Sequence, residues 1–526
     1  MIRQWFRRRK HNQQLKEVIE HPTSKLNEKL KIPLYADFEK NRKVFKDLFA
    51  DCDDVIFHPF YIGKEVQAEL IYFEHLSDIG EINTNVLFPL MLKADPSNNP
   101  EYILERELPV SSAKQVKTFY DCVNAITCGN AILLIKKANW ALNLGISKWE
   151  KRPIDEPENE PVIRGPKEGF IEPLRDNVAL IRRKIRSPYL KTKSLHIGRY
   201  TNTQVIVSYI EGIVDPDILQ ETFRRLERID IDGVLESGYI EEIIQDNPFS
   251  PFPQIQTTER VDIVTASLLE GRVAILTDGS PVVMIVPVTL PMMLQATEDY
   301  YNRFMVSTLL RWMRYFLFLA SIALPSFYVA IITFHQEAVP TDQLLSFAAA
   351  RERIPIPTLI EAIIMEFAFE ALREAGLRLP RIIGSAVTIV GALVIGDSAV
   401  RAGLVSAPTI IVVAATGIAS FTVPKYALGF SLRMLRFPLL LLSGILGIIG
   451  LMLGLLLILI HLCSLRSFGV PYLSPLVGQT RRSDLKDVLL RAPWWNKKYR
   501  PRFLHPQNQI RQEEGQRPDP EHGGES

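Results

Sequence analysis

The chain lacks the residues and motifs that most enzymes and metalloproteins carry. It has only 4 cysteines in 526 residues, and none of them forms a CxxC pair. We therefore expect buried, reduced thiols in place of a zinc or redox site. The sequence also contains no P-loop, no GxSxG, no HExxH and no dinucleotide-binding fingerprint after a predicted strand. These absences predict a protein without catalytic residues, bound metal or cofactor.

Isolated polar residues give no stronger indication of catalysis. His58, His75 and His196 stand apart in the sequence, and a lone histidine is more often a surface or core residue than a ligand or base. The aspartates within residues 51–54 do not have the spacing of a metal-binding loop. We expect all of these side chains to have structural roles.

An excess of one charge is also missing. The chain has 61 lysines and arginines against 59 aspartates and glutamates, a net charge of +2, so nothing in the overall charge points to nucleic acid. Residues 1–20 contain a basic cluster that no apolar segment follows. This pattern is not that of a signal peptide, and we expect the N-terminal region to remain in the cytoplasm.

Residues before about position 300 have the composition of a soluble α/β region in two subdomains. The first is expected in residues 1–148, with a basic leader, and the second in residues 173–300. Residues 149–172 are dense in proline, glutamate and glycine, which is typical of a linker. In the second subdomain, Asp215 followed by Pro216 predicts the start of a helix, and Gly271 predicts the end of another.

Apolar segments then follow and predict an α-helical transmembrane domain over residues 301–465, with four to five spans. The candidate spans are residues 315–334, 382–395, 404–423 and 437–463. Arg303, Arg311 and Arg314 precede the first span, which places the α/β region in the cytoplasm by the positive-inside rule. Residues 466–526 form a basic tail that we expect on the cytoplasmic side, with a disordered end.

The segment 358–372 is ambiguous because it combines apolar residues with glutamates. Glu366, Glu370 and Glu374 recur every four residues, so they share one face of a helix. A row of carboxylates facing lipid is too costly. Either this helix lies in the membrane interface with its acidic face in water, or its acidic face lines water within an assembly. The first alternative gives four spans and the second gives five.

The region 382–424 is the expected centre of a pore or carrier. Its two apolar runs are rich in small residues that allow helices to approach closely. Val387, Val390 and Val394 share one helical face, next to a face of small residues that includes Gly391. The valines either contact lipid, or form an apolar constriction around an axis in symmetric copies. Asp397 either pairs locally with Arg401 or lies at the mouth of the pore.

The last candidate span carries a row of glycines. Gly444, Gly447, Gly450 and Gly454 recur at intervals of three and four residues. Such a face favours close contact between helices in a bilayer. We therefore expect these glycines to pack against another helix.

Two long segments resemble a known family. Residues 247–287, NPFSPFPQIQTTERVDIVTASLLEGRVAILTDGSPVVMIVP, and residues 323–421, which end in GDSAVRAGLVSAPTIIVVAATGIASF, are similar to the A subunit of GerA-type nutrient germinant receptors of endospore-forming bacteria. The resemblance covers about residues 50–500. Val261 is a departure, since the family pattern has proline there.

The resemblance implies a membrane subunit in the spore inner membrane, with its N-terminal domain facing the spore core. It implies two partners, a permease-like B subunit and a lipoprotein C subunit. It also implies a ring, expected to be a pentamer, that acts as a germinant-gated channel for monovalent cations, with residues 385–396 lining the pore. The alternatives are a membrane-anchored scaffold whose soluble domain binds, and a solute carrier. A carrier is disfavoured because no internal repeat is evident in the sequence.

Overall fold

The computed structural model describes residues 30–63, 65–92, 109–110, 112–136, 138–147, 156–157, 160–378, 396–477 and 482–518. The chain divides into two compact units. The first, here called the α/β unit, comprises residues 1–245, 255–287 and 493–526, and the second, the helical unit, comprises residues 246–254 and 288–492. Residues 466–492, expected in the tail, therefore belong to the helical unit.

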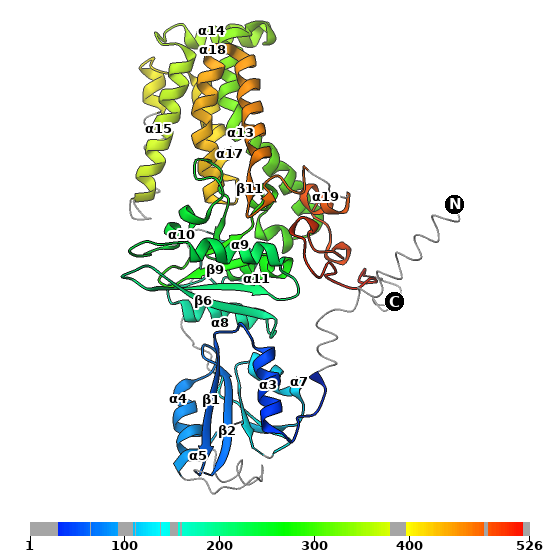
Figure 1. The fold of residues 1–526 in the computed structure, drawn as a ribbon. Coiled ribbons are helices and arrows are strands. Elements are labelled where there is room, and N and C mark those ends of the chain that lie inside the picture. Colours follow the sequence, from blue (N-terminus) through cyan, green and yellow to red (C-terminus); the bar gives the residue numbers. More distant parts are fainter. Residues whose placement is uncertain are drawn as a thin grey trace, which may run out of the picture. The chain divides into compact units, whose positions relative to one another are not determined.

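The first half of the α/β unit is an antiparallel sheet covered on both faces. Its strand order is β1-β2-β4-β5-β3. The strands are β1 (Val55–Ile62), β2 (Val66–Phe73), β3 (Ala113–Val116), β4 (Ala131–Ile135) and β5 (Ala141–Leu144). Helices α3 (Phe38–Leu48) and α7 (Phe119–Thr127) lie on one face, and α4 (Ile79–Glu81), η1 (Ile82–Leu87) and α5 (Phe88–Leu92) lie on the other (Figure 1). Alternate residues of the central strands serve the two cores: Leu70 and Leu133 face α5, whereas Ile71 and Ile132 face α3.

The second half has the same strand order, β6-β7-β9-β10-β8. Its strands are β6 (Leu190–Ile197), β7 (Thr203–Ile210), β8 (Gln256–Thr258), β9 (Val273–Thr277) and β10 (Val283–Val286), and its helices are α8 (Leu174–Lys184), α9 (Pro216–Glu227), α10 (Ser237–Ile244) and α11 (Val261–Glu270). The predicted α/β class is confirmed. Asp215 caps α9, and Gly271 ends α11 in a left-handed conformation, as the sequence predicted.

The two halves also share a pair of hydrogen bonds between an asparagine side chain and the backbone. Together with the strand order, this indicates that the α/β unit contains an internal repeat. Asn41 in α3 bonds both backbone groups of Tyr35, its Oδ1 accepting from the amide at 2.9 Å and its Nδ2 donating to the carbonyl at 2.7 Å. Asn177 in α8 bonds Ile171 in the same way, at 2.9 Å and 2.5 Å. Both asparagines lie six residues after their partner. The repeat was not evident in the sequence, because it is one of topology.

A buried ion pair joins the two halves. Arg182 donates to both carboxylate oxygens of Asp54, from Nε at 2.7 Å and from Nη2 at 2.8 Å, and both residues are buried. Thr192 Oγ1 donates to the same carboxylate at 2.6 Å. Asp54 of the predicted acidic cluster therefore has a structural role.

We expect Asp54→Ala to destabilise the α/β unit by about 3–5 kcal/mol, because Arg182 would keep its charge in the interior without a partner. The matched control is Asp230→Ala, since Asp230 pairs with Arg199 in a similar bidentate manner but on the surface. Water screens that exposed pair, so its loss should have little effect on stability. Thermal unfolding of the purified full chain checks the prediction. Equal shifts for both variants would contradict it.

The cysteines agree only partly with expectation. Cys52 and Cys122 are buried and all described thiols are free, whereas Cys463 is exposed. Burial raises the pKa of the Cys122 thiol to about 12. This thiol therefore stays protonated and inert at neutral pH.

Among its described residues, the helical unit has four long helices: α13 (Phe304–Phe334), α15 (Thr358–Arg378), α17 (Ala407–Phe421) and α18 (Tyr426–Ser464). Shorter elements are α12 (Leu290–Met293), η3 (Thr297–Tyr300), α14 (Thr341–Arg351), α19 (Arg482–Leu489) and the pair β11 (Arg466–Ser467) and β12 (Val470–Pro471). Among the described residues, α13 and α18 are long and apolar enough to cross a membrane. The expected four to five spans are not established by this criterion.

Helix α18 is a hairpin of two helices, not the single span expected for residues 437–463. Gly447 breaks it with φ 64° and ψ −141°, a conformation that only glycine adopts readily. Leu442 then packs on Gly450 and Leu439 on Gly454. The first half (residues 426–446) and the second half (residues 448–464) are about 31 Å and 26 Å long at 1.5 Å per residue. The composition of the segment is apolar throughout, so hydropathy does not reveal the turn.

Residue pairs give the directions of the other helices. Leu359, Glu366 and Glu370 of α15 meet Gly444, Arg436 and Arg433 of α18 respectively, so α15 runs antiparallel to the first half of α18. Glu361 of α15 meets Ser406, which caps α17, and Phe369 of α15 meets Gly417, so α15 and α17 run in the same direction. In Figure 1 these helices stand side by side.

Candidate functional site: a buried charge ladder

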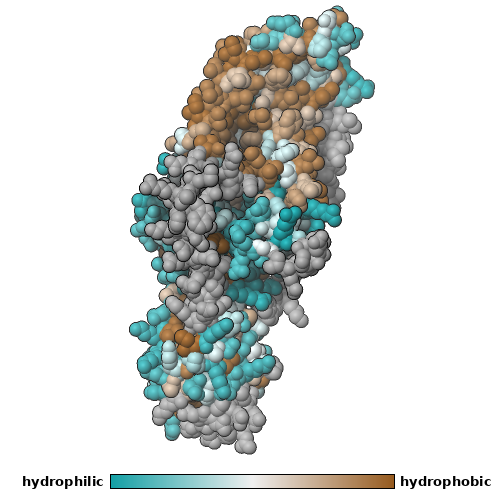
Figure 2. Space-filling model, turned by 90° about the vertical axis from the view of Figure 1, so that its right-hand side faces the viewer, coloured by the Kyte–Doolittle hydropathy of each residue, from teal (hydrophilic) through white to brown (hydrophobic). Residues whose placement is uncertain are grey.

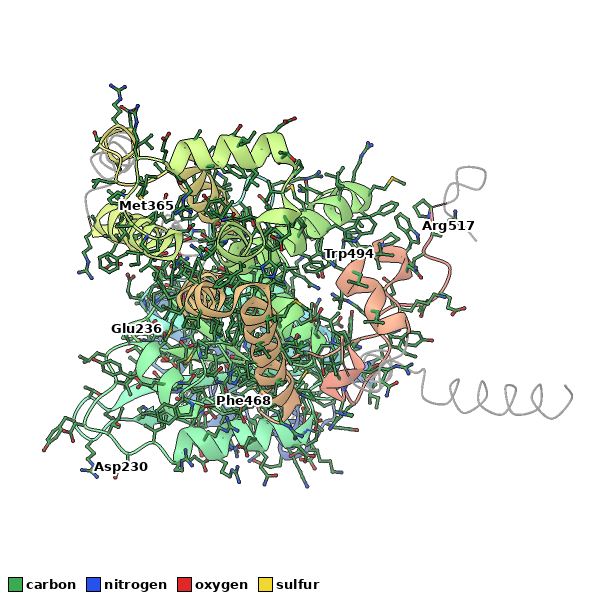
Figure 3. The ribbon with its side chains drawn as sticks, turned by 90° about the horizontal axis from the view of Figure 1, so that it is seen from above. Asp230, Glu236, Met365, Phe468, Trp494 and Arg517 are labelled. Carbon is green, nitrogen blue, oxygen red and sulfur yellow. The ribbon has the colours of Figure 1, made fainter. Side chains whose placement is uncertain are left out.

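The most unusual feature of the helical unit is a row of charged residues in its interior. Three glutamates of α15 lie beside four arginines, one from α15 itself, one from α14 and two from α18, and we call this set the charge ladder. Its members are Glu361, Glu366, Glu370, Arg351, Arg373, Arg433 and Arg436. Figure 3 views the helices from above and labels Met365, which precedes Glu366 on α15. The four-residue spacing predicted a shared face correctly, but this face lies inside the unit and not in an interface.

Glu366 and Arg436 form the central rung, and both are buried. Arg436 Nη1 donates to Glu366 Oε2. Arg436 Nε donates at 3.0 Å to the carbonyl of Ser321 in α13. That carbonyl is available because Pro325, four residues later, has no N–H to bond it. The rung therefore joins three helices and satisfies a backbone group that the proline leaves free.

Glu361 forms the rung at one end of the ladder. Its Oε1 accepts from the Ser406 backbone N–H and, at 2.6 Å, from Ser406 Oγ. A carboxylate at this position stabilises the N-terminus of α17. Arg351 Nη2 lies 3.7 Å from Glu361 Oε2.

Glu370 forms the rung at the other end. Arg373 Nη2 donates to its Oε2, and Arg433 Nε lies 3.4 Å from its Oε1. Glu374, the last residue of the predicted acidic face, instead pairs with Arg378 in solvent, at 2.7 Å. The acidic face is therefore buried at Glu366, half-buried at Glu370 and exposed at Glu374, one turn later.

The predicted gate residues are only partly placed. Val387, Val390, Gly391 and Val394 lie outside the described residues. Asp397 is exposed and forms an ion pair with Arg401, with 2.9 Å between Oδ2 and Nε.

The four predicted packing glycines contact two kinds of neighbour. A Cβ on Gly444 would lie 2.5 Å from Leu359 of α15, and one on Gly447 would lie 3.1 Å from Phe334 of α13. Gly450 and Gly454 instead contact Leu442 and Leu439 in the first half of α18 itself. All four glycines therefore lie in close contact with a helix, and for Gly450 and Gly454 that helix is the first half of α18.

The loop formed by residues 246–254 is anchored at one end of α18. Phe252 is buried, with its ring centroid 6.1 Å from that of His461. Ser250 Oγ bonds His461 Nε2 at 2.8 Å, and Ser467 Oγ donates to the Gln254 carbonyl at 2.6 Å. The structure places Phe252 in the core of the helical unit, whereas Phe249 of the same loop is exposed.

Helix α19 is held on α13 through its last carbonyls. Trp312 Nε1 donates to the Leu489 carbonyl at 2.7 Å, and Tyr315 Oη donates to the Val488 carbonyl at 2.6 Å. Arg311 donates to the Asp487 carbonyl, which places a cation at the negative end of the helix dipole. Arg311, read from the sequence as a topological marker, is thus fully buried and structural.

Sequence reasoning missed the arginines of the ladder as partners of the glutamates. No partner for Arg433 or Arg436 was predicted from the sequence. The available signal was their position within an apolar stretch, because a charge in such a stretch needs an internal partner.

Comparisons with known proteins assign the family. A family model described as Bacillus/Clostridium GerA spore germination protein matches residues 43–503. Two relatives come from Bacillus subtilis (strain 168). The chain is 46% identical over 470 residues to "Uncharacterized membrane protein YfkQ", covering 89% of this chain and 91% of that protein. It is 43% identical over 485 residues to "Spore germination protein KA", covering 91% and 89%.

A solved structure is also similar to this chain. It is the N-terminal domain of the A subunit of the Bacillus megaterium spore germinant receptor GerK3, with 31% identity and a TM-score of 0.39, covering 48% of this chain and 96% of that one. The length and identity of the sequence matches are sufficient for assignment, and the chain belongs to the Bacillus/Clostridium GerA spore germination protein family.

Proposed function

We propose that this chain is the A-type membrane subunit of a nutrient germinant receptor and forms a ring-shaped, germinant-gated cation channel. It would act in the spore inner membrane, with its α/β unit on the cytoplasmic side. Its partners would be a permease-like B subunit and a lipoprotein C subunit, and the ring would be a pentamer. Relatives named as spore germination proteins support the process.

The observation that carries the membrane role is the inverted polarity of the helical unit. Phe316, Ile445 and Ile449 are more than half exposed, and Figure 2 shows apolar surface over the helices. Glu366 and Arg436 are buried inside. Polar groups turned inward and apolar groups turned outward are typical of helices in lipid.

The gate would lie at Val387, Val390, Gly391 and Val394, followed by Asp397 at the mouth. Arg378 ends α15 at one end, whereas Gly403 lies next to the carbonyl of Arg353, just before the other end of α15. Arg378 and Gly403 therefore lie toward opposite ends of α15. The charge ladder on α15 precedes the proposed gate residues in the sequence.

Alanine substitutions at Val390 and Val394 test this gate. Shortening the valines of an apolar constriction widens it and favours hydration, so the closed state loses stability. We expect basal cation release without germinant to rise about tenfold, since about 1.4 kcal/mol is sufficient for such a change. Cation flux from liposomes or spores that contain the receptor measures it.

The control is Val413→Ala, which removes the same atoms from a buried position in α17. It should lower stability with no change in basal flux. If neither gate variant leaks and both respond normally to germinant, the chain is better described as a membrane-anchored scaffold.

A further inference from the structure

We infer that the end of the charge ladder around Arg433 binds the phosphate group of an anionic phospholipid, between α15 and the first half of α18. The site consists of Arg373, Arg433 and Arg436 together with Glu366 and Glu370. This inference rests on the membrane location proposed above but not on ion conduction.

The charges at this end of the ladder do not balance. Three arginines face two glutamates, and the charged neighbours that act on Arg433 among the described residues are Arg373, Arg436 and Glu370. The Arg433 side chain is 6% exposed and that of Arg436 is 1% exposed. A net positive charge in such a position is costly unless an anion compensates it. The site therefore requires one further negative charge.

The hydrogen-bond donors are also not all used. Among the described residues, Arg433 Nε and Nη2, Arg373 Nε and Arg436 Nη2 are buried without a hydrogen-bond partner, so four such donors stand against two such acceptors, Glu366 Oε1 and Glu370 Oε1. Arg433 and Glu370 are close enough for an ion pair at 3.4 Å but form no hydrogen bond. The planar guanidinium groups present donors in the geometry that phosphate oxygens accept. A phosphate group would therefore supply both the negative charge and the acceptor oxygens that these arginines need.

The surroundings favour an anion that carries acyl chains. Arg433 lies over the rings of Tyr426 and Phe430, at 5.7 Å and 5.6 Å, and both rings are more than half exposed. Phe367 on α15 and Met434 on α18 are exposed on the same two helices. Arg433 lies only two turns from the start of α18, where a headgroup would be found if the helix enters a bilayer. Basic sites between membrane helices are known to take lipid headgroups.

Lipid binding to the purified full chain tests the site. Native mass spectrometry in detergent would titrate phosphatidylglycerol, with phosphatidylcholine as the zwitterionic comparison. Arg433→Gln and Arg373→Gln should each weaken phosphatidylglycerol binding by about tenfold, because each removes a charge-assisted contact. Glu370→Gln should strengthen it, because it increases the positive excess. A purely structural role would not give opposite signs.

Controls separate this site from general surface charge. Arg378→Gln, in an exposed pair one turn beyond Arg373, should bind lipid as the unmodified protein does. Unchanged phosphatidylglycerol binding in both Arg433→Gln and Arg373→Gln would overturn the proposal. Equal affinity for the two lipids would also overturn it. If Arg433→Gln does not fold, Arg373→Gln and Glu370→Gln still give the answer.

Inorganic phosphate distinguishes the source of the anion. If millimolar phosphate displaces phosphatidylglycerol, the occupant is a soluble phosphate and the assignment to lipid is wrong. If it does not, the occupant is lipid. None of these measurements depends on cation flux. A negative result for the lipid site can therefore be distinguished from a negative result for the proposed gate.

Discussion

Arg436→Ala is expected to destabilise the helical unit by about 3–5 kcal/mol, since it leaves a buried charge without its partner. Glu366 would remain fully buried with no counterion. The Ser321 carbonyl, which receives Arg436 Nε at 3.0 Å, would also lose its bond. Helices α13, α15 and α18 would then be held by apolar contacts alone at this level of the unit.

Thermal unfolding of the full chain in detergent measures this effect. Arg401→Ala is the control, because it removes an arginine from the exposed ion pair with Asp397. An exposed ion pair contributes about 1 kcal/mol at most to stability. The double variant Glu366→Leu with Arg436→Met should recover most of the stability, since it removes both charges and keeps the volume. If the double variant is less stable than Arg436→Ala, the pair does more than balance charge.

Gly447→Ala should prevent the hairpin of α18 from closing. At φ 64° and ψ −141° any side chain is strained by about 1–3 kcal/mol. The added Cβ would also lie 2.9 Å from His335 Cε1 and 3.1 Å from Phe334 Cβ. Because neighbours on α13 would have to move, we expect a total cost above that of strain alone.

An engineered disulfide between the two halves of α18 tests directly whether the hairpin forms. In a Cys463→Ser background, Leu439→Cys with Gly454→Cys should oxidise readily, because these positions pack together. In a straight helix they would be about 22 Å apart. Adding Gly447→Ala should abolish the cross-link. The matched control is Gly469→Ala, which also has a positive φ but nothing within 4 Å of an added Cβ. Cross-linking that survives Gly447→Ala would contradict the role of this glycine.

The sequence predicted local features of the fold well. Asp215 with Pro216 placed the start of α9, and Gly271 placed the end of α11. These features depend on neighbouring residues alone. The shared strand order of the two sheets was not predictable in this way, because it depends on which distant strands pair.

The candidate site was predicted in its spacing but not in its partners. Glu366 and Glu370 share a face because a helix repeats every 3.6 residues. That this face meets Arg433 and Arg436 depends on the antiparallel register of α15 and α18. The turn at Gly447 was hidden for a different reason, since a glycine that packs and a glycine that bends the chain look alike in an apolar segment.

The turn at Gly447 also determines the sidedness of the C-terminal region. If α18 enters a bilayer, its two halves form one entry and one exit, so Lys425 and Arg466 emerge at the same membrane face. Lys425 before α18 and the basic residues after it then obey the positive-inside rule together, which a single crossing of this segment does not allow. Labels attached at both positions should accordingly be reached from one compartment only.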